Sequence, residues 1–193
     1  GPCAGKTSSL SEISNFFRSR GWNVFTAREA ATVLLSGGVD FSQCNSEQVF
    51  EVQNRIVRLM LTLEDSYNAI CEAANPGEKC LVVCDRGIMD ASVYCDKPTW
   101  QRVLDANGLS PDASDSRYDG VIHLVTAADG AEDFYNLESN TEGVRTESAE
   151  AARGLDLKTR AVWEGHPALH IIDNSSDFPT KVKRVVSALC GIV

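Results

Sequence analysis

The sequence predicts an α/β protein in which a parallel sheet is covered by helices on both faces. Short apolar runs, bounded by polar or glycine-containing turns, alternate with longer segments whose apolar residues recur every three or four positions. Strands that are separated by helical crossovers pair in parallel, and such a sheet needs helices over both faces. At 193 residues we expect a single domain, residues 1–193, that buries its core without disulfides or a metal.

The individual elements follow from the apolar pattern along the chain. Helices are expected over residues 6–20, 28–35, 46–74, 98–108 and 177–190. Strands are expected over residues 22–26, 80–84, 120–125 and 169–172. The run at 80–84, Cys-Leu-Val-Val-Cys, is uninterrupted and apolar, which indicates a central parallel strand covered on both faces.

Two helices carry apolar stripes that predict which side chains are buried. The long helix at 46–74 is expected to bury Val49, Val52, Ile56, Leu59, Leu63 and Ile70. The closing helix is expected to bury Phe178, Val182, Val185, Val186 and Leu189. Both stripes follow the helical repeat, so we expect these two helices to pack on the sheet.

Composition limits the classes of function. With 18 basic and 27 acidic residues, the net charge is −9, which argues against a nucleic-acid binder because phosphate contacts need clustered Lys and Arg. No apolar run approaches the roughly 18 residues that a membrane helix needs, so we expect no transmembrane segment. Seven cysteines without a Cys-x-x-Cys pair, together with three histidines, favour free thiols over a structural metal site. We therefore expect a soluble, cytoplasmic protein.

The strongest chemical signal lies in the first seven residues, Gly-Pro-Cys-Ala-Gly-Lys-Thr. They match the last seven positions of the phosphate-binding pattern G-x-x-x-x-G-K-[ST]. Glycines let backbone amides curl around a polyphosphate, and the following helix presents its positive end. Lys6 adds a charge for the terminal phosphates, and the Thr7 hydroxyl can bind Mg²⁺. The residues expected to bind the nucleotide are Gly1, Pro2, Cys3, Ala4, Gly5, Lys6, Thr7 and Ser8.

The start of the chain suggests a cut. There is no initiating Met, and the first glycine of the pattern would fall before Gly1. In P-loop proteins a strand leads into this loop. We therefore expect that the first strand of the sheet is missing from the chain.

Asp85 follows the apolar strand 80–84 directly, as the carboxylate beside the metal does in the second motif of nucleoside triphosphatases. A strand-end turn or a helix cap is the alternative role for this residue. Joined to the Gly-Lys-Thr loop, Asp85 predicts a metal site formed with Thr7. The expected ligands are Mg²⁺ and a nucleoside triphosphate, GTP or ATP.

Several segments together resemble a known family. They are residues 1–7, 27–31, 85–87, 118–131, 163–167 and 172–174. The chain resembles the N-terminal ATPase-like P-loop domain of the TRPL translocation defect protein family, which is akin to ribosylnicotinamide and nucleoside kinase domains. The resemblance implies a three-layer P-loop fold of kinase type with a helical lid at about 127–165. It also implies guanine-nucleotide binding, phospholipid association and a C-terminal domain that this chain lacks.

The resemblance also implies roles for single residues. Arg86 and Arg145 would add charge at the phosphates, so that the expected catalytic residues are Lys6, Asp85, Arg86 and Arg145. Asn174 would contact the base, with a turn residue as the alternative. The expected acceptor-binding residues are Arg28, Glu29 and Gln53. For Glu29 a helix first-turn acid is the alternative, and for Gln53 a solvent-facing position.

Three functions are consistent with these residues. The leading hypothesis is a Mg²⁺-dependent protein that hydrolyses GTP or switches on it. The second is a small-molecule kinase in which Asp85 takes the proton of the acceptor hydroxyl and Glu29 binds the acceptor. The third is a scaffold that binds nucleotide without turnover. A Ras-type GTPase is disfavoured because the chain contains no Asn-Lys-x-Asp motif.

Overall fold

The computed structural model describes residues 4–134 and 148–193. The chain divides into two compact units. Gly1–Phe16 and Asp115–Val193 form the first, called here the terminal unit, and Phe17–Ser114 form the second, the central unit. Helix α1 (Lys6–Arg18) begins in the terminal unit and ends in the central unit.

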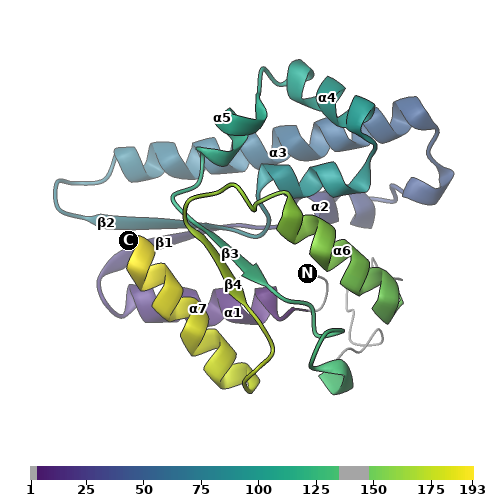
Figure 1. Ribbon diagram of the computed structural model, residues 1–193. Coiled ribbons are helices and arrows are strands. Elements are labelled where there is room, and N and C mark those ends of the chain that lie inside the picture. Colours follow the sequence, from purple (N-terminus) through teal and green to yellow (C-terminus); the bar gives the residue numbers. More distant parts are fainter. Residues whose placement is uncertain (1–3, 135–147) are drawn as a thin grey trace. The chain divides into compact units, whose positions relative to one another are not determined.

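The central unit is built on two parallel strands. β1 (Trp22–Ala27) pairs with β2 (Lys79–Cys84) in a register that runs from Trp22 beside Lys79 to Ala27 beside Cys84. The crossover between them contains α2 (Ala30–Ser36), the 3-10 turn η1 (Phe41–Gln43) and α3 (Ser46–Glu72). After β2 come η2 (Ile88–Tyr94), α4 (Lys97–Ala106) and α5 (Pro111–Asp115). In Figure 1, α3 runs alongside the strand pair, which it contacts.

Helix α3 has a well-defined N-terminal cap, and its burial follows the predicted apolar stripe only in part. Asn45 caps the helix in a capping box with Gln48, which satisfies the first backbone donors. Of the predicted stripe, Ile56 is buried, whereas Val49, Val52, Leu59 and Leu63 are half-buried. Val57 and Met60, which lie outside the predicted stripe, are also buried. Ile70, predicted to be buried, is 52% exposed. The reason is length, because a helix of 27 residues spans about 40 Å and outruns strands of about 20 Å.

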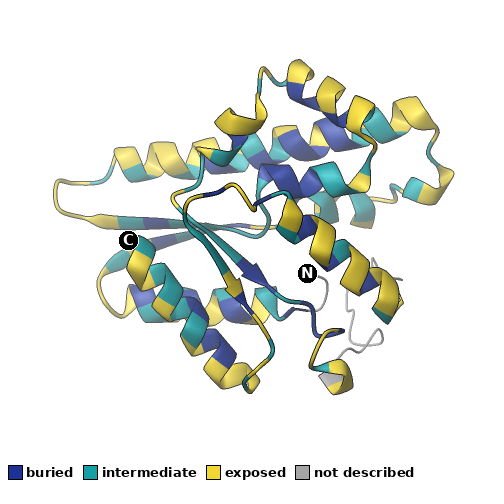
Figure 2. Ribbon diagram, viewed as in Figure 1, coloured by how far each residue is buried: buried dark blue, intermediate teal, exposed yellow. Residues whose placement is uncertain are grey.

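The terminal unit is also built on two parallel strands. β3 (Val121–Leu124) pairs with β4 (Leu169–Ile172) from Val121 beside Leu169 to Leu124 beside Ile172. Between them lie η3 (Glu132–Phe134) and α6 (Ala149–Ala161). Helix α7 (Phe178–Ile192) follows β4 and contacts it. Figure 2 shows the buried residues of α7 along one side of the helix.

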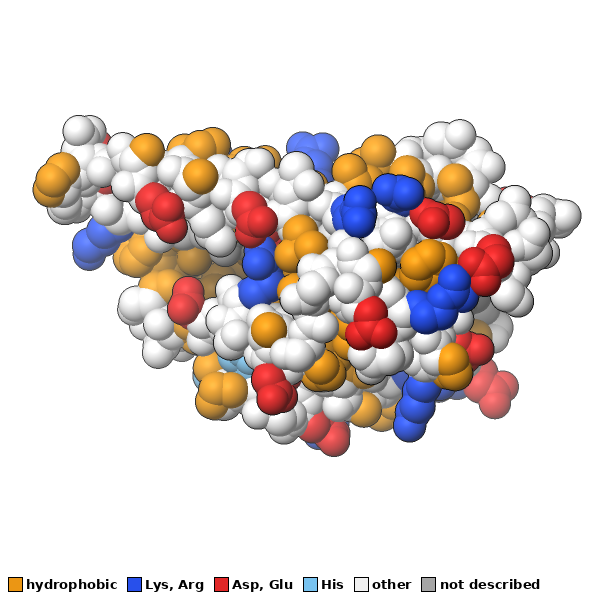
Figure 3. All heavy atoms as spheres, turned by 90° about the horizontal axis from the view of Figure 1, so that it is seen from above, with side chains coloured by type: hydrophobic (Ala, Val, Ile, Leu, Met, Phe, Trp, Pro, Cys, Tyr) orange, Lys and Arg blue, Asp and Glu red, His pale blue; other side chains and the backbone are white. Residues whose placement is uncertain are grey.

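The alternation of helices with parallel strands confirms the α/β class, whereas the three-layer arrangement stays a prediction. The single domain over residues 1–193 also stays a prediction. Besides Ile70, two further burial expectations are wrong. Phe178, expected in the stripe of the closing helix, is 44% exposed, and in strand β2 only Leu81 is buried. In the view of Figure 3, acidic and basic side chains are interspersed over the surface. Neither sign of charge is concentrated in one patch on this face.

Candidate functional site

The glycine-lysine loop has the local geometry that its sequence predicts. Gly5 has φ +80°, a left-handed conformation that glycine adopts without steric cost, and α1 begins at the next residue, Lys6. The Gly5 carbonyl accepts hydrogen bonds from the backbone N–H and the hydroxyl of Ser9, at 2.9 and 2.8 Å. The loop is thus fixed at its last glycine, while Thr7 and Ser8 are exposed at the start of the helix. A helix start of this kind offers backbone N–H donors and a positive dipole end to an anion.

Some of the predicted site residues lie outside the described residues. They are Gly1, Pro2, Cys3 and Arg145. The predicted helical lid contains α6, whose Arg153 donates a hydrogen bond of 2.6 Å to the Ala128 carbonyl. The roles of the four residues and of the lid stay predictions.

Asn174 lies just after β4 and links it to the segment that follows β3. Its Nδ2 donates to the carbonyls of Thr126 and Asp129 at 2.8 and 2.6 Å. Its Oδ1 accepts a hydrogen bond of 2.6 Å from Nζ of Lys181, which also donates to the Val125 carbonyl at 3.0 Å. The Asn174 amide therefore ties together the carboxyl ends of the two strands. Its predicted contact with a nucleotide base stays a prediction.

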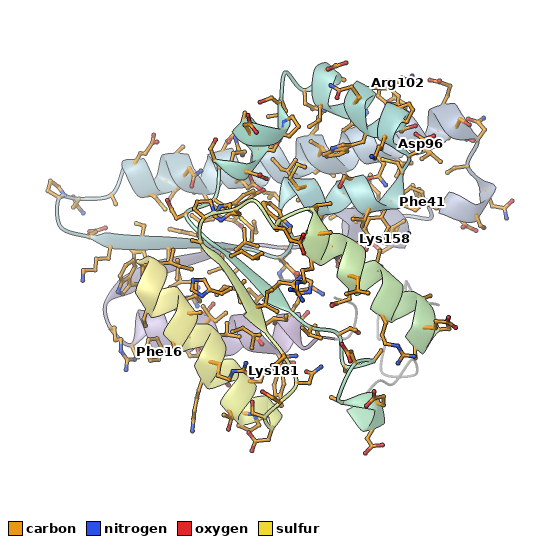
Figure 4. All side chains as sticks on the ribbon, viewed as in Figure 1. Phe16, Phe41, Asp96, Arg102, Lys158 and Lys181 are labelled. Carbon is orange, nitrogen blue, oxygen red and sulfur yellow. The ribbon has the colours of Figure 1, made fainter. Side chains whose placement is uncertain are left out.

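Lys181, labelled in Figure 4, is a buried cation that the sequence did not single out. Burial lowers the pKa of Lys181 from its ordinary value, although nearby Asp156 opposes the change. A lysine within an amphipathic helix is usually exposed to solvent. The burial of Lys181 is therefore visible only in the tertiary structure. Its ammonium group donates hydrogen bonds to the Val125 carbonyl and to Oδ1 of Asn174.

The side chains of His123 and Asp156 form a buried pair at the end of β3. Nε2 of His123 lies 3.1 Å from Oδ2 of Asp156, and both side chains are almost fully buried. The other Asp156 oxygen accepts a hydrogen bond of 3.0 Å from the Thr126 backbone N–H. Burial alone would raise the pKa of Asp156, but the hydrogen bond with His123 is among the interactions that bring it below its ordinary value. We call His123, Thr126, Asp156, Asn174 and Lys181 the β3 network.

In the central unit, the residues after β1 and β2 form an ion-paired cluster. Nε of Arg86 donates to Oε1 of Glu29 at 2.5 Å, and the guanidinium lies 6.0 Å from the ring centroid of Tyr94. The other Glu29 oxygen accepts from the Thr32 hydroxyl at 3.3 Å. Burial alone would lower the pKa of Arg86, but its interactions with Tyr94, Glu29 and Asp90 raise it. Arg86 therefore stays charged while largely buried.

The backbone at this cluster is unusual. Arg86 has φ +80°, and it is the one non-glycine residue with a positive φ among the residues that the structure describes. Asp85 before it donates its N–H to the Ala27 carbonyl at 2.7 Å, which continues the β1–β2 ladder by one bond. The chain then turns at Arg86 into η2, whose Asp90 carboxylate accepts from the Gly87 N–H at 3.2 Å.

The remaining predicted acceptor residues differ in exposure. Arg28 is exposed just after β1. Gln53 is 1% exposed on α3, among the most deeply buried side chains. The alternative of a solvent-facing Gln53 is therefore wrong. Their predicted roles in acceptor binding stay predictions.

The chemistry of the donor set suits Mg²⁺. The Thr7 hydroxyl and the Asp85 carboxylate are hard oxygen donors, and one Asp85 oxygen, Oδ1, is buried. No group of three or more His, Cys, Asp and Glu side chains suited to a metal occurs within residues 4–134 and 148–193. A Mg²⁺ ion held largely by nucleotide phosphates and water needs only one or two protein ligands. The pairing of Thr7 with Asp85 stays a prediction.

Two further expectations concern the chain as a whole. In the described part of the chain, no helix combines the length and apolar character needed to cross a bilayer. The six described cysteines are free thiols and form no disulfide with one another.

A left-handed glycine followed by Lys-Thr at a helix start, in a chain of parallel α/β units, defines a P-loop nucleotide-binding domain. A family model described as an AAA domain matches residues 1–181, and the chain belongs to this family. The match includes the loop, the strands β1, β2, β3 and β4 of the described residues, and α6. P-loop domains of this kind generally bind a nucleotide together with Mg²⁺. A search of curated proteins finds no match to the chain.

Proposed function

We propose that the chain is a Mg²⁺-dependent P-loop protein that binds a nucleoside triphosphate, with GTP as the expected nucleotide, and hydrolyses it or switches on it. The observation that supports this most directly is the turn from Gly5, at φ +80°, into α1 at Lys6. This turn combines backbone N–H donors, a helix dipole and a lysine at the same point.

The roles follow from the chemistry of each group. Lys6 and the loop amides bind the terminal phosphates, and Thr7 offers its hydroxyl to the metal. Mg²⁺, when bound, would neutralise the charge that develops on the phosphates. Asp85, directly after β2, would hold the metal together with Thr7. The ion pair between Arg86 and Glu29 holds the turn that carries Asp85, and this supports a positioning role for Arg86 as well as a contribution of charge.

The preference for guanine rests on the resemblance to the TRPL translocation defect proteins. The same resemblance supports association with phospholipid. The phosphate loop itself does not distinguish GTP from ATP, because its amides and Lys6 contact only phosphates. A base preference must come from side chains elsewhere in the site.

Isothermal titration with GTP, ATP, GDP and ADP, with and without Mg²⁺, tests the proposal. Lys6→Ala is expected to weaken triphosphate binding by at least 10-fold, because about 1.5–3 kcal/mol is typical for a hydrogen bond to a charged group. Lys97→Ala removes an exposed lysine at the start of α4 and serves as the matched control. Equal affinity of wild type and Lys6→Ala would refute nucleotide binding by this loop.

A small-molecule kinase is the second candidate, because Glu29 and Asp85 lie just beyond the paired ends of β1 and β2. In that case the acceptor would compete with Arg86 for Glu29, whose two oxygens are already hydrogen-bonded. A panel of nucleosides with GTP or ATP separates the candidates. A phosphorylated nucleoside formed at ordinary turnover would overturn the proposal of hydrolysis, and tight binding without any turnover would identify a scaffold.

A further inference from the structure

The terminal unit contains both the phosphate loop and the carboxyl ends of β3 and β4. In open parallel α/β sheets, ligands bind beyond the carboxyl ends of the strands. The segment after β4 runs through Asp173 and Asn174 to Phe178, the first residue of α7. This segment is therefore the part of the unit where a nucleotide on the loop would find side chains for its base.

The polar side chains of this segment already bind their own chain. The Asn174 amide uses both its nitrogen and its oxygen within the β3 network. The Asp173 carboxylate accepts from the hydroxyl and N–H of Ser175 and from Arg184. Recruiting either group to a base would break bonds that hold the strand ends. The base contact predicted for Asn174 therefore carries an energetic cost.

Phe178 differs from these residues in two respects. Its ring lies directly against Gly5, so that a Cβ atom added at Gly5 would overlap the ring. The same side chain is 44% exposed, although the helical pattern predicts a buried position. Phe178 therefore contacts the phosphate loop and keeps part of its aromatic side chain exposed, where a base could reach it.

We propose that Phe178 is the surface against which the base of the bound nucleotide stacks. The inference rests on the proposed binding of a nucleoside triphosphate by the Gly5–Lys6 loop. Stacking on an aromatic ring depends on the area of the base and little on its hydrogen-bonding edge. Phe178 therefore favours purine over pyrimidine nucleotides and does not distinguish GTP from ATP.

The test compares ligands that share phosphates and differ in the base. GTP, ATP, CTP and inorganic tripolyphosphate are titrated against wild type, Phe178→Leu and Phe178→Trp in the presence of Mg²⁺. Leu keeps apolar packing on Gly5 but has no aromatic face, and Trp enlarges that face. Phe178→Leu is expected to weaken GTP and ATP roughly 10-fold and to leave tripolyphosphate within about twofold. Phe178→Trp is expected to retain purine binding, with tryptophan fluorescence that changes with GTP and not with tripolyphosphate.

Ile70→Ala, which removes a side chain 52% exposed on α3, is the matched control and should change none of the affinities. Equal weakening of GTP and tripolyphosphate in Phe178→Leu would overturn the inference, because the ring would then only support the loop. Unchanged GTP affinity would overturn it as well. If Lys6→Ala weakens binding and Phe178→Leu does not, this inference alone fails. If wild type binds none of the ligands, the proposed function fails with it.

Discussion

Replacing Asp156 by Ala removes the acceptor at the centre of the β3 network. Two buried donors lose their partner in this variant. They are the Thr126 N–H, at 3.0 Å in a residue that is 0% exposed, and the ring of His123, at 3.1 Å in a residue that is 5% exposed. Neither donor is near enough to solvent to recover a hydrogen bond from water without local opening.

The cost can be estimated from these two contacts. Leaving a buried donor unsatisfied costs about 1–3 kcal/mol, so two donors cost about 2–6 kcal/mol. The loss of a carboxylate near the buried Lys181 acts in the same direction. With about 3 kcal/mol lost and a shift of roughly 2–4 °C per kcal/mol at this chain length, Tm is expected to fall by roughly 6–12 °C.

Urea unfolding followed by circular dichroism measures the difference, with thermal scans alongside. Asp156→Asn is the matched comparison, because its amide oxygen can still accept from the Thr126 N–H and the His123 ring can adopt the other tautomer. We expect Asn to cost about 1 kcal/mol. If Asp156→Ala costs less than 0.5 kcal/mol, which is typical of a surface change, the argument that this network stabilises the unit is refuted.

Two other predictions concern the strand ends. Arg86→Gly is expected to be more stable than Arg86→Ala by about 0.5–1 kcal/mol, because both lose the ion pair with Glu29 but only Ala is strained at φ +80°; equal urea midpoints would contradict this. Hydrogen bonds from Ser175 and Arg184 lower the pKa of Asp173 from 3.8 to about 2. A lowered carboxylate pKa stabilises the fold above the unfolded pKa, and the contribution is lost as the pH falls from about 4 towards 2. The stability difference between wild type and Asp173→Asn should therefore be constant above about pH 5 and shrink below pH 4, as measured by urea midpoints across this range.

Local signals in the sequence were enough to predict the described strands and the start of a helix directly after Gly5. The run at 80–84 forms β2, and the Gly-Lys-Thr sequence places the left-handed turn at Gly5 directly before α1. Such features depend on neighbours in the chain, so a single sequence reveals them. The turn η2 after Asp85 was not predicted, because its conformation depends on tertiary contacts.

The partners of the site residues could not be predicted in this way. Glu29 and Arg86 were assigned separate roles, although they form one ion pair across 57 residues of sequence. The register of β1 and β2, with Ala27 beside Cys84, places each of them two residues beyond the paired ends. Likewise the pattern of α7 predicts an apolar face but not that its first residue, Phe178, lies on Gly5 with 44% exposure.

The hydrogen bonds around Asn174 also affect the rate at which this residue deamidates. An Asn-Ser sequence deamidates when the backbone nitrogen of the serine attacks the side-chain carbonyl carbon of the asparagine. Here that carbonyl is held by Lys181, and the N–H of Ser175 donates to Asp173 at 3.2 Å. Both reacting groups are thus fixed in the folded chain, and conversion of Asn174 to aspartate must wait for the segment to open. The conversion would then place a negative charge where the amide nitrogen now donates to two carbonyls, so a molecule that has once opened and reacted could not rebuild the same connection between β3 and β4.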